Sequence, residues 1–199
     1  MANPDRRTAL LKSYENAALI VSGVTMKQVK ARTPCPGYDV AALIDHLVEA
    51  AHRAVSLGRG RTPPAGDDSP HVKLADAPDQ LRRAAEEAAR AWGDDSRLSS
   101  SIAMPWGEAF SGVTLVNMYL AELATHAWDL AFATGQLDRL DTCLATAALD
   151  GARAMLKPEY RDMVATGSPF GAEVPSPPDA DDWQRLAAFM GRDPLASLD

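Results

Sequence analysis

The chain lacks long apolar runs and has no excess of positive charge. Polar side chains interrupt even its longest apolar stretches every few residues, and its N-terminus, MANPDRRTALL, has acidic Asp5 and no apolar block before a cleavage site. We therefore expect no transmembrane helix, no signal peptide and a cytoplasmic location. The formal net charge is -7, which leaves no basic surface for phosphate groups. This balance argues against nucleic-acid and membrane partners.

Cysteine is scarce, with only Cys35 and Cys143 in the chain. Two cysteines are too few for a disulfide framework and are typical of reduced, cytosolic thiols. Cys35 precedes a predicted helix N-terminus, where the pKa of a thiol can fall, so a nucleophilic role is one interpretation. The prolines on both sides of it and the lack of a neighbouring base favour a structural role. Cys143 lies on the apolar stripe of a predicted helix, and we expect it in the core.

Several catalytic signatures are also missing. The sequence has no glycine-rich phosphate loop, no GxSxG motif and no CxxC pair. It has no internal repeat of solenoid length and no low-complexity tract. These absences remove the common nucleotide-binding, serine-hydrolase and dithiol signatures.

What the chain does have is a globular composition with helical periodicity. It is 199 residues long and 46% hydrophobic, and its alanine-rich apolar positions recur at helical rather than alternating spacing. One hydrophobic core is the simplest expectation for this length. The predicted fold class is all-α, an up-and-down four-helix bundle over residues 1–156, with a short C-terminal extension, residues 157–199, packed on it.

Apolar residues three and four positions apart predict helices over residues 5–30, 40–57, 77–98, 113–134, 141–156 and 179–190. Proline and glycine mark the other segments, which are a long surface loop at 58–76, a turn or short hairpin at 99–112 and a short strand at 170–174. Asp39 is placed to cap the second helix, and Gly135 to end the fourth in a left-handed conformation.

The predicted fourth helix carries a pair of candidate metal ligands. Glu122 and His126 are four residues apart, so their side chains lie on one face and can reach one ion. A carboxylate oxygen with imidazole nitrogens suits zinc, nickel, iron or manganese better than calcium or magnesium. His46, in the middle of the predicted second helix, can lie opposite this pair. Three protein ligands leave an open position, as in catalytic rather than structural metal sites.

Spacing alone leaves a second interpretation open. His46 can be a hydrogen-bonded core histidine, and Glu122 and His126 a helical ion pair. The apolar neighbours of Glu122 favour a binding role, because a charged carboxylate among them is costly without a partner. Asp129 lies seven residues after Glu122 on nearly the same face. It can accept the free ring N–H of a ligating histidine, or it can face solvent.

Other candidate residues are weaker. His52 follows His46 by six residues, which turns it away from the proposed ligand face, and His71 lies in the predicted long loop. Neither is a chosen ligand. Trp106 and Trp128 can line a substrate pocket, although a tryptophan in a small domain more often fills the core.

The chain also carries a set of motifs in a familiar order: TPCPGYDVAALIDHL, PWGEAFSG, ELATHAWDLAFATGQ, PFGAEV and DADDWQRLAAFMGRDP. Together, from about Tyr14 to Pro194, they resemble an actinobacterial family of mycothiol-associated maleylpyruvate isomerase N-terminal-like proteins, within the DinB-like superfamily of metal-binding four-helix bundles. The resemblance implies a metal site whose ligands are His46, Glu122 and His126.

The resemblance has limits that bear on activity. Tyr38 stands where the family's turn usually has tryptophan, and the true isomerase carries a larger C-terminal domain that contributes to its active site. Maleylpyruvate isomerisation is therefore not expected here. The expected function is a metal-dependent enzyme, a transferase or isomerase, that uses mycothiol on an electrophilic small molecule. A metal-dependent hydrolase and a non-catalytic metal-binding or small-molecule-binding module are the alternatives. The catalytic residues, the physiological metal (zinc is the first choice) and the oligomeric state, a homodimer included, stay open.

Overall fold

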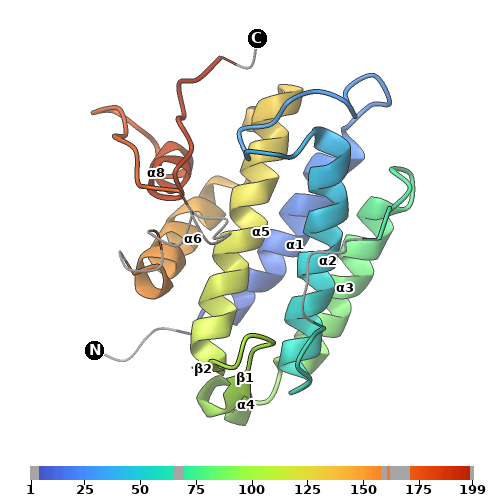
Figure 1. Cartoon of the computed structure of the whole chain (residues 1–199), viewed down its shortest axis with the longest axis vertical. Coiled ribbons are helices and arrows are strands. Elements are labelled where there is room, and N and C mark those ends of the chain that lie inside the picture. The colour runs from blue at the N-terminus through green and yellow to red at the C-terminus, as the bar shows by residue number, and fades with distance from the viewer. Residues whose placement is uncertain (1–4, 65–69, 158–160, 162–170, 198–199) are drawn as a thin grey trace.

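A computed structural model describes the chain over residues 5–64, 70–157, 161 and 171–197. Across these residues the protein is mostly helical, with seven α-helices, one short 3-10 helix and one two-stranded antiparallel sheet (Figure 1). The predicted helical character is thus confirmed, and the small sheet is the hairpin expected within residues 99–112. Within the described residues, no helix is both long and apolar enough to span a membrane.

Four of the helices pack closely on one another. They are α1 (Arg7–Ser22), α2 (Val40–Gly58), α3 (Ala77–Ala91) and α5 (Gly112–Thr134). Both α1 and α2 pack against α3 on one side and against α5 on the other. Their large, fully buried side chains include Tyr14, Leu43, Leu47, Leu81, Leu120 and Leu123.

Helix α5 is covered on more than one side. Besides α1 and α2, it contacts α6 (Thr142–Met155), and α8 (Asp182–Phe189) packs against α6 and touches α5 (Figure 1). The middle of α5 is therefore buried around almost its whole circumference. Polar and charged side chains in this stretch, Asn117, Thr125, His126 and Asp129, are buried with it and need partners inside the protein.

The ends of the two site-bearing helices follow local signals. Asp39 accepts a hydrogen bond from the backbone N–H of Ala42 at 2.9 Å, which caps α2 as predicted. Ser111 caps α5 by accepting from the N–H of Thr114. Gly135 ends α5 with φ 72°, the left-handed conformation that glycine adopts without strain. These caps set where α2 begins and where α5 begins and ends.

Two predicted helix ends and one predicted strand are wrong. The helix predicted at 5–30 ends at Ser22, where Gly23 follows, and residues 26–30 form turns. The helix predicted at 77–98 ends at Ala91 and resumes only as α4 (Ser96–Ser99), because Gly93 interrupts it. The strand predicted at 170–174 is not formed by residues 171–174, and residue 170 lies outside the described residues.

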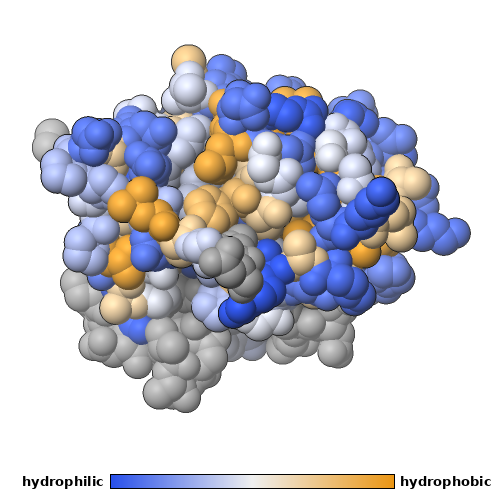
Figure 2. Space-filling model, turned by 90° about the horizontal axis from the view of Figure 1, so that it is seen from above, coloured by the Kyte–Doolittle hydropathy of each residue, from blue (hydrophilic) through white to orange (hydrophobic). Residues whose placement is uncertain are grey.

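The loops gather at two ends of the helices. The hairpin of β1 (Ser101–Ala103) and β2 (Ala109–Ser111) lies beside the start of α5, and the loop between α1 and α2 lies beside its other end (Figure 1). From that second end, polar residues surround a smaller group of apolar ones (Figure 2). The exposed large apolar side chains of the described residues are Leu19, Met26, Trp106, Leu137 and Leu195.

Candidate metal centre

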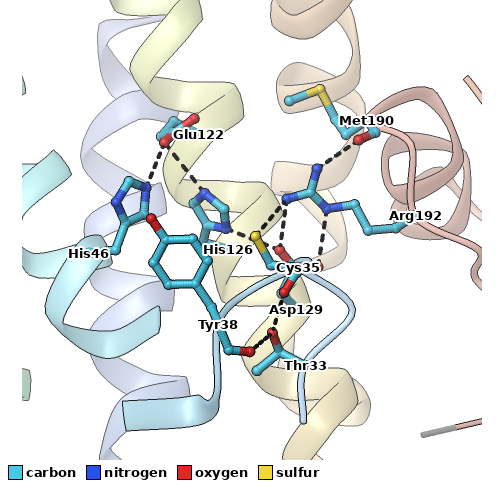
Figure 3. A network of polar contacts seen from close by, with 9 residues as sticks. All are labelled: Thr33, Cys35, Tyr38, His46, Glu122, His126, Asp129, Met190 and Arg192. Atoms are coloured by element: carbon cyan, nitrogen blue, oxygen red, sulfur yellow. Dashed lines mark hydrogen bonds and ion pairs between the residues drawn. The ribbon is translucent and has the colours of Figure 1, made fainter. Parts of the chain in front are cut away.

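Helices α2 and α5 bring the three predicted ligands together. His46 Nε2 lies 3.0 Å from Glu122 Oε1, and His126 Nε2 lies 3.4 Å from the same oxygen (Figure 3). The two imidazole rings meet edge to face, with their centroids 5.0 Å apart. One ligand atom from each of the three residues lies within 4.8 Å of the other two. Residues 76 positions apart in the sequence therefore form one cluster of donors.

This donor set fits a divalent transition-metal ion. An ion with four tetrahedral bonds of the usual zinc length keeps its donors about 3.3 Å apart, and the two measured spacings are close to this. The alternative interpretation also agrees with this geometry, because His46 Nε2 lies at hydrogen-bond distance from Glu122 Oε1, and Glu122 and His126 form a helical ion pair. What favours a binding role is that both imidazole rings, from two helices, meet at the same carboxylate oxygen.

The cluster is partly exposed to solvent. The side chains of His46 and Glu122 are 15% and 13% exposed, whereas that of His126 is 3% exposed. The ring of Tyr38 lies beside His46, with 5.3 Å between the ring centroids. Tyr38 and Cys35 also line an open hollow of about 270 Å³ in the loop between α1 and α2. The residues that line this hollow do not include the three candidate ligands, so the opening of the cluster itself rests on the partial exposure of His46 and Glu122.

The cluster stabilises positive charge. Burial acts to raise the pKa of Glu122, but the charges and hydrogen bonds of His126 and His46 hold it far below its usual range. Burial acts to lower the pKa of His126. The Glu122 charge and hydrogen bonds with Asp129 and Cys35 outweigh burial, so the pKa of His126 is raised well above its usual value. Glu122 is therefore an anion. It can stabilise a proton on a histidine nitrogen or a metal ion bound between its carboxylate and the histidine nitrogens.

Asp129 fixes the ring of His126. Asp129 Oδ2 lies 3.0 Å from His126 Nδ1, and the Asp129 side chain is fully buried. The predicted contact with the ring is confirmed, and the solvent-facing alternative is wrong. An ionised carboxylate can only accept hydrogen bonds, so Nδ1 carries the proton and Nε2 faces Glu122. This arrangement is common behind metal-bound histidines.

Arg192 is a site residue that the sequence did not reveal. Its side chain is 3% exposed, with Nε 3.3 Å from Asp129 Oδ1 and Nη2 3.2 Å from Asp129 Oδ2. Nη2 also lies 3.5 Å from the Sγ of Cys35. Arginine is usually exposed, and this one is 63 residues from its partner, so periodicity gives no signal. Its place in the motif GRDP was the one available hint.

Cys35 has no base beside it in the sequence, but the fold places His126 and Arg192 next to it. It is buried, it hydrogen-bonds with His126, and it contacts the Arg192 guanidinium (Figure 3). Cys35, His126 and Asp129 also form a compact buried group of potential ligand atoms. Arg192 already supplies positive charge to two of these three side chains, and its charge would repel a metal ion there. The cluster of His46, Glu122 and His126 is therefore the better candidate.

The remaining candidates lie away from the cluster. Cys143 is exposed near the start of α6, so the prediction that it lies in the core is wrong. Its predicted stripe begins only with Leu144, one residue deeper in the helix. His52 is exposed, as expected for a residue turned from the ligand face. Trp128 is buried against Phe132 and fills the core, whereas Trp106 is 59% exposed near the hairpin turn.

The fold and the cluster define a mostly helical protein that presents two histidines and a glutamate from two neighbouring helices. The chain belongs to the family described as the mycothiol maleylpyruvate isomerase N-terminal domain, whose model matches residues 10–131. The resemblance proposed from the sequence motifs is confirmed. The matched region contains all three candidate ligands, and Arg192 lies outside it.

Two relatives cover almost the whole chain. They are "Uncharacterized protein MT0763" of Mycobacterium tuberculosis (strain CDC 1551 / Oshkosh) and "Uncharacterized protein Rv0738" of Mycobacterium tuberculosis (strain ATCC 25618 / H37Rv). Each is 33% identical over 181 residues, which cover 91% of this chain and 94% of the relative. No solved structure gives a significant match.

Proposed function

We propose that this protein binds a divalent metal ion through His46, Glu122 and His126 and uses it to react a low-molecular-weight thiol, mycothiol, with an electrophilic small molecule. The observation that carries the proposal is the convergence of three donor atoms within 4.8 Å, from two helices, at a partly solvent-exposed position. Zinc is the first candidate because nitrogen and carboxylate donors in this number are typical of catalytic zinc sites.

The packing of the helices supports a DinB-like four-helix bundle as the framework. In this assignment α1, α2, α3 and α5 form the bundle, and the pairing of each of α1 and α2 with both α3 and α5 supports it. The site then lies inside the bundle between facing helices, which is a usual place for metal sites in such folds. The extension is assigned to residues 157–199, and in its described part α8 packs on α6.

Each residue of the cluster has a defined task in this proposal. His46 and His126 offer ring nitrogens, Glu122 offers an anionic oxygen, and Asp129 holds the ring of His126 so that Nε2 faces the ion. Because the pKa of His126 is raised in the metal-free protein, metal binding there displaces the proton at Nε2. When bound here, a divalent ion lowers the pKa of a thiol or a water molecule at its open position and so makes a nucleophile available near neutral pH. The ring of Tyr38 packs beside that of His46.

A metal-dependent hydrolase and a non-catalytic binding module are the alternatives. The thiol is preferred because the family to which the chain belongs is named for a mycothiol-dependent isomerase. Turnover of an electrophilic substrate only in the presence of thiol and metal supports the proposal. Metal-dependent turnover without thiol favours the hydrolase, and ligand binding without turnover favours the module.

Metal binding should stabilise the folded protein. Because the complete donor cluster exists only in the folded state, zinc at about a thousand times its Kd adds roughly 4 kcal/mol to the free energy of unfolding. For a domain of this size that raises Tm by roughly 10 °C. Thermal unfolding with and without zinc, after treatment with a chelator, measures this shift. In Glu122→Gln, which keeps the shape of the side chain but loses its charge, the shift should be much smaller. Equal shifts in both proteins would place the ion elsewhere.

Thiol binding should release a proton if the thiol binds as thiolate. A free thiol is mostly protonated near neutral pH, so its heat of binding should depend on the ionisation heat of the buffer. Calorimetry of the zinc-loaded protein with mycothiol in two such buffers tests this. The dependence should survive Cys35→Ser, which removes the protein's own buried thiol, and disappear in His46→Ala. Binding that is absent, or equally strong in the metal-free protein, would contradict the thiol proposal.

A further inference from the structure

We propose that Arg192 is a positioning residue of the metal centre, which holds Asp129 and through it the ring of His126. The C-terminal segment would then take part in the site, although it lies beyond the region matched by the family model. The effect on metal affinity rests on the proposed function. The positioning itself does not, because it concerns contacts among side chains of this chain.

The backbone after α8 directs Arg192 into the protein. Gly191 has φ 81°, a left-handed conformation, and a Cβ added there would lie 3.0 Å from the Cα of Gly171 and the carbonyl oxygen of Ala172. Beyond this turn, the backbone N–H of Arg192 donates to the carbonyl of Ala187 at 2.8 Å. The chain therefore reverses at the end of α8, and the long side chain that follows points back toward α5 (Figure 3).

The guanidinium group is held on three sides. Nη1 donates to the carbonyl of Met190 at 2.7 Å, Nη2 lies 3.5 Å from the Sγ of Cys35, and Nε and Nη2 reach the two oxygens of Asp129. Such a two-pronged contact fixes the plane of a carboxylate as well as its place, which a single point charge does not. Arg192 thus determines which way the oxygens of Asp129 face.

The orientation of Asp129 then determines that of His126. Oδ2 is contacted both by Arg192 Nη2, at 3.2 Å, and by His126 Nδ1, at 3.0 Å. Rotation of the carboxylate would break the contact with the ring, and the ring would lose the constraint that turns Nε2 toward Glu122. Along this line Glu122, His126, Asp129 and Arg192 alternate between anionic and cationic character, which stabilises the whole row in the buried interior.

Arg192→Met tests the role, because methionine is unbranched and apolar and cannot hold the carboxylate. Loss of a residue that orients a metal-bound histidine typically weakens metal binding by roughly ten- to a hundredfold. We expect a fall of that size in zinc affinity, measured by competition with a chromophoric chelator. The matched control is Arg185→Met on α8, where an exposed arginine pairs with Asp182 within the helix. Its zinc affinity should equal that of wild type.

A second readout separates positioning from general stability. The Nδ1 proton of His126 should give a slowly exchanging NMR signal in wild type, with or without zinc, because Asp129 accepts it inside the protein. In Arg192→Met this proton should exchange at least tenfold faster, while backbone amide protons in the middle of α5 stay protected. A purely structural role would change both sets of protons together.

A double substitution tests whether Arg192 acts through Asp129. If it does, Arg192→Met combined with Asp129→Asn should weaken zinc binding no more than Asp129→Asn alone. If the losses in zinc affinity of the two single variants multiply in the double variant, Arg192 acts on the ion by another route, and the proposal is overturned. If Arg192→Met does not fold, Arg192→Lys keeps the charge without the two-pronged contact and should show the same changes at smaller size.

The outcomes distinguish this proposal from the proposed function. A wild-type protein that binds no metal ends the metal proposal, but the exchange of the Nδ1 proton in the metal-free protein still decides the role of Arg192. Unchanged exchange in the Arg192 variants overturns the positioning role. If wild type binds zinc, and the Nδ1 proton exchanges faster in the Arg192 variants while their zinc affinity equals that of wild type, the effect on the metal centre is refuted.

Discussion

His126→Ala should abolish stoichiometric binding of divalent metal. The substitution removes one of the three protein donors. The donor that is lost is the histidine whose Nδ1 contacts the buried Asp129. We expect affinity to fall by more than about a hundredfold, because two remaining donors compete poorly with water. Elemental analysis of protein purified without chelator, together with zinc titration, measures the loss.

The control for this experiment is His52→Ala. His52 lies on α2 with His46, but it is exposed and outside the cluster, so its removal should leave zinc binding intact. Circular dichroism establishes whether His126→Ala is folded. If it is not, Glu122→Gln serves as the second variant, since it removes the anionic donor with little change in shape. Stoichiometric zinc retained by a folded His126→Ala protein would refute the assignment.

Asp129→Ala should lower the free energy of unfolding by about 3–5 kcal/mol, because removal of one member of a buried ion pair leaves the other charge without compensation. Here the remaining charge is Arg192, 3% exposed, and the ring N–H of His126 loses its acceptor as well. For a domain of this size, the Tm of the metal-free protein should fall by roughly 10 °C or more. Urea and thermal unfolding of the metal-free proteins measure both quantities.

Acid should diminish the difference in the free energy of unfolding between wild type and Asp129→Ala. Burial acts to raise the pKa of Asp129, but the charges of Arg192 and His126 outweigh it and lower that pKa. A carboxyl whose pKa is lowered by folding stabilises the folded state above its unfolded pKa of about 3.9 and loses this contribution as pH falls further. The difference should therefore be full at pH 7 and shrink below about pH 4.

Asp79→Ala is the matched control for the stability measurement. Asp79 forms an exposed ion pair with Arg82 one turn along α3, and such pairs contribute about 0.5 kcal/mol or less. A similar loss in the two variants would mean that the buried pair contributes no more than a surface one. A loss in Asp129→Ala that is equally large at pH 3 and pH 7 would contradict its assignment to an ionised carboxylate.

Local chemistry was enough to predict much of this protein. Helical spacing of apolar residues located the long helices, and Asp39 and Gly135 marked a start and an end because caps depend on only a few neighbouring residues. The pairing of Glu122 with His126 also follows from one turn of helix. His46 was harder, since its approach to the pair depends on how two helices pack, and the family resemblance supplied most of that prediction.

Prediction and structure differ where a single residue decides the outcome. The helices predicted at 5–30 and 77–98 continued past Gly23 and Gly93, although glycine weakens a helix and the apolar spacing beyond it was sparse. Cys143 was placed on the apolar stripe, but it lies in the first turn of α6, where one residue of rotation separates core from solvent.

The sequence by itself determined the helical class, the main caps and the Glu122 and His126 pair, because these depend on residues within one or two turns of each other. Only the tertiary structure decided that Asp129 is buried and that Arg192 is its partner. Burial of Asp129 results from the cover that neighbouring helices give α5, and the chain must reverse at Gly191 before Arg192 can reach it. No periodicity encodes a contact between residues 63 positions apart. An unpaired buried charge is costly, so Asp129 requires a partner such as Arg192, but this requirement follows only once the packing shows that Asp129 is buried.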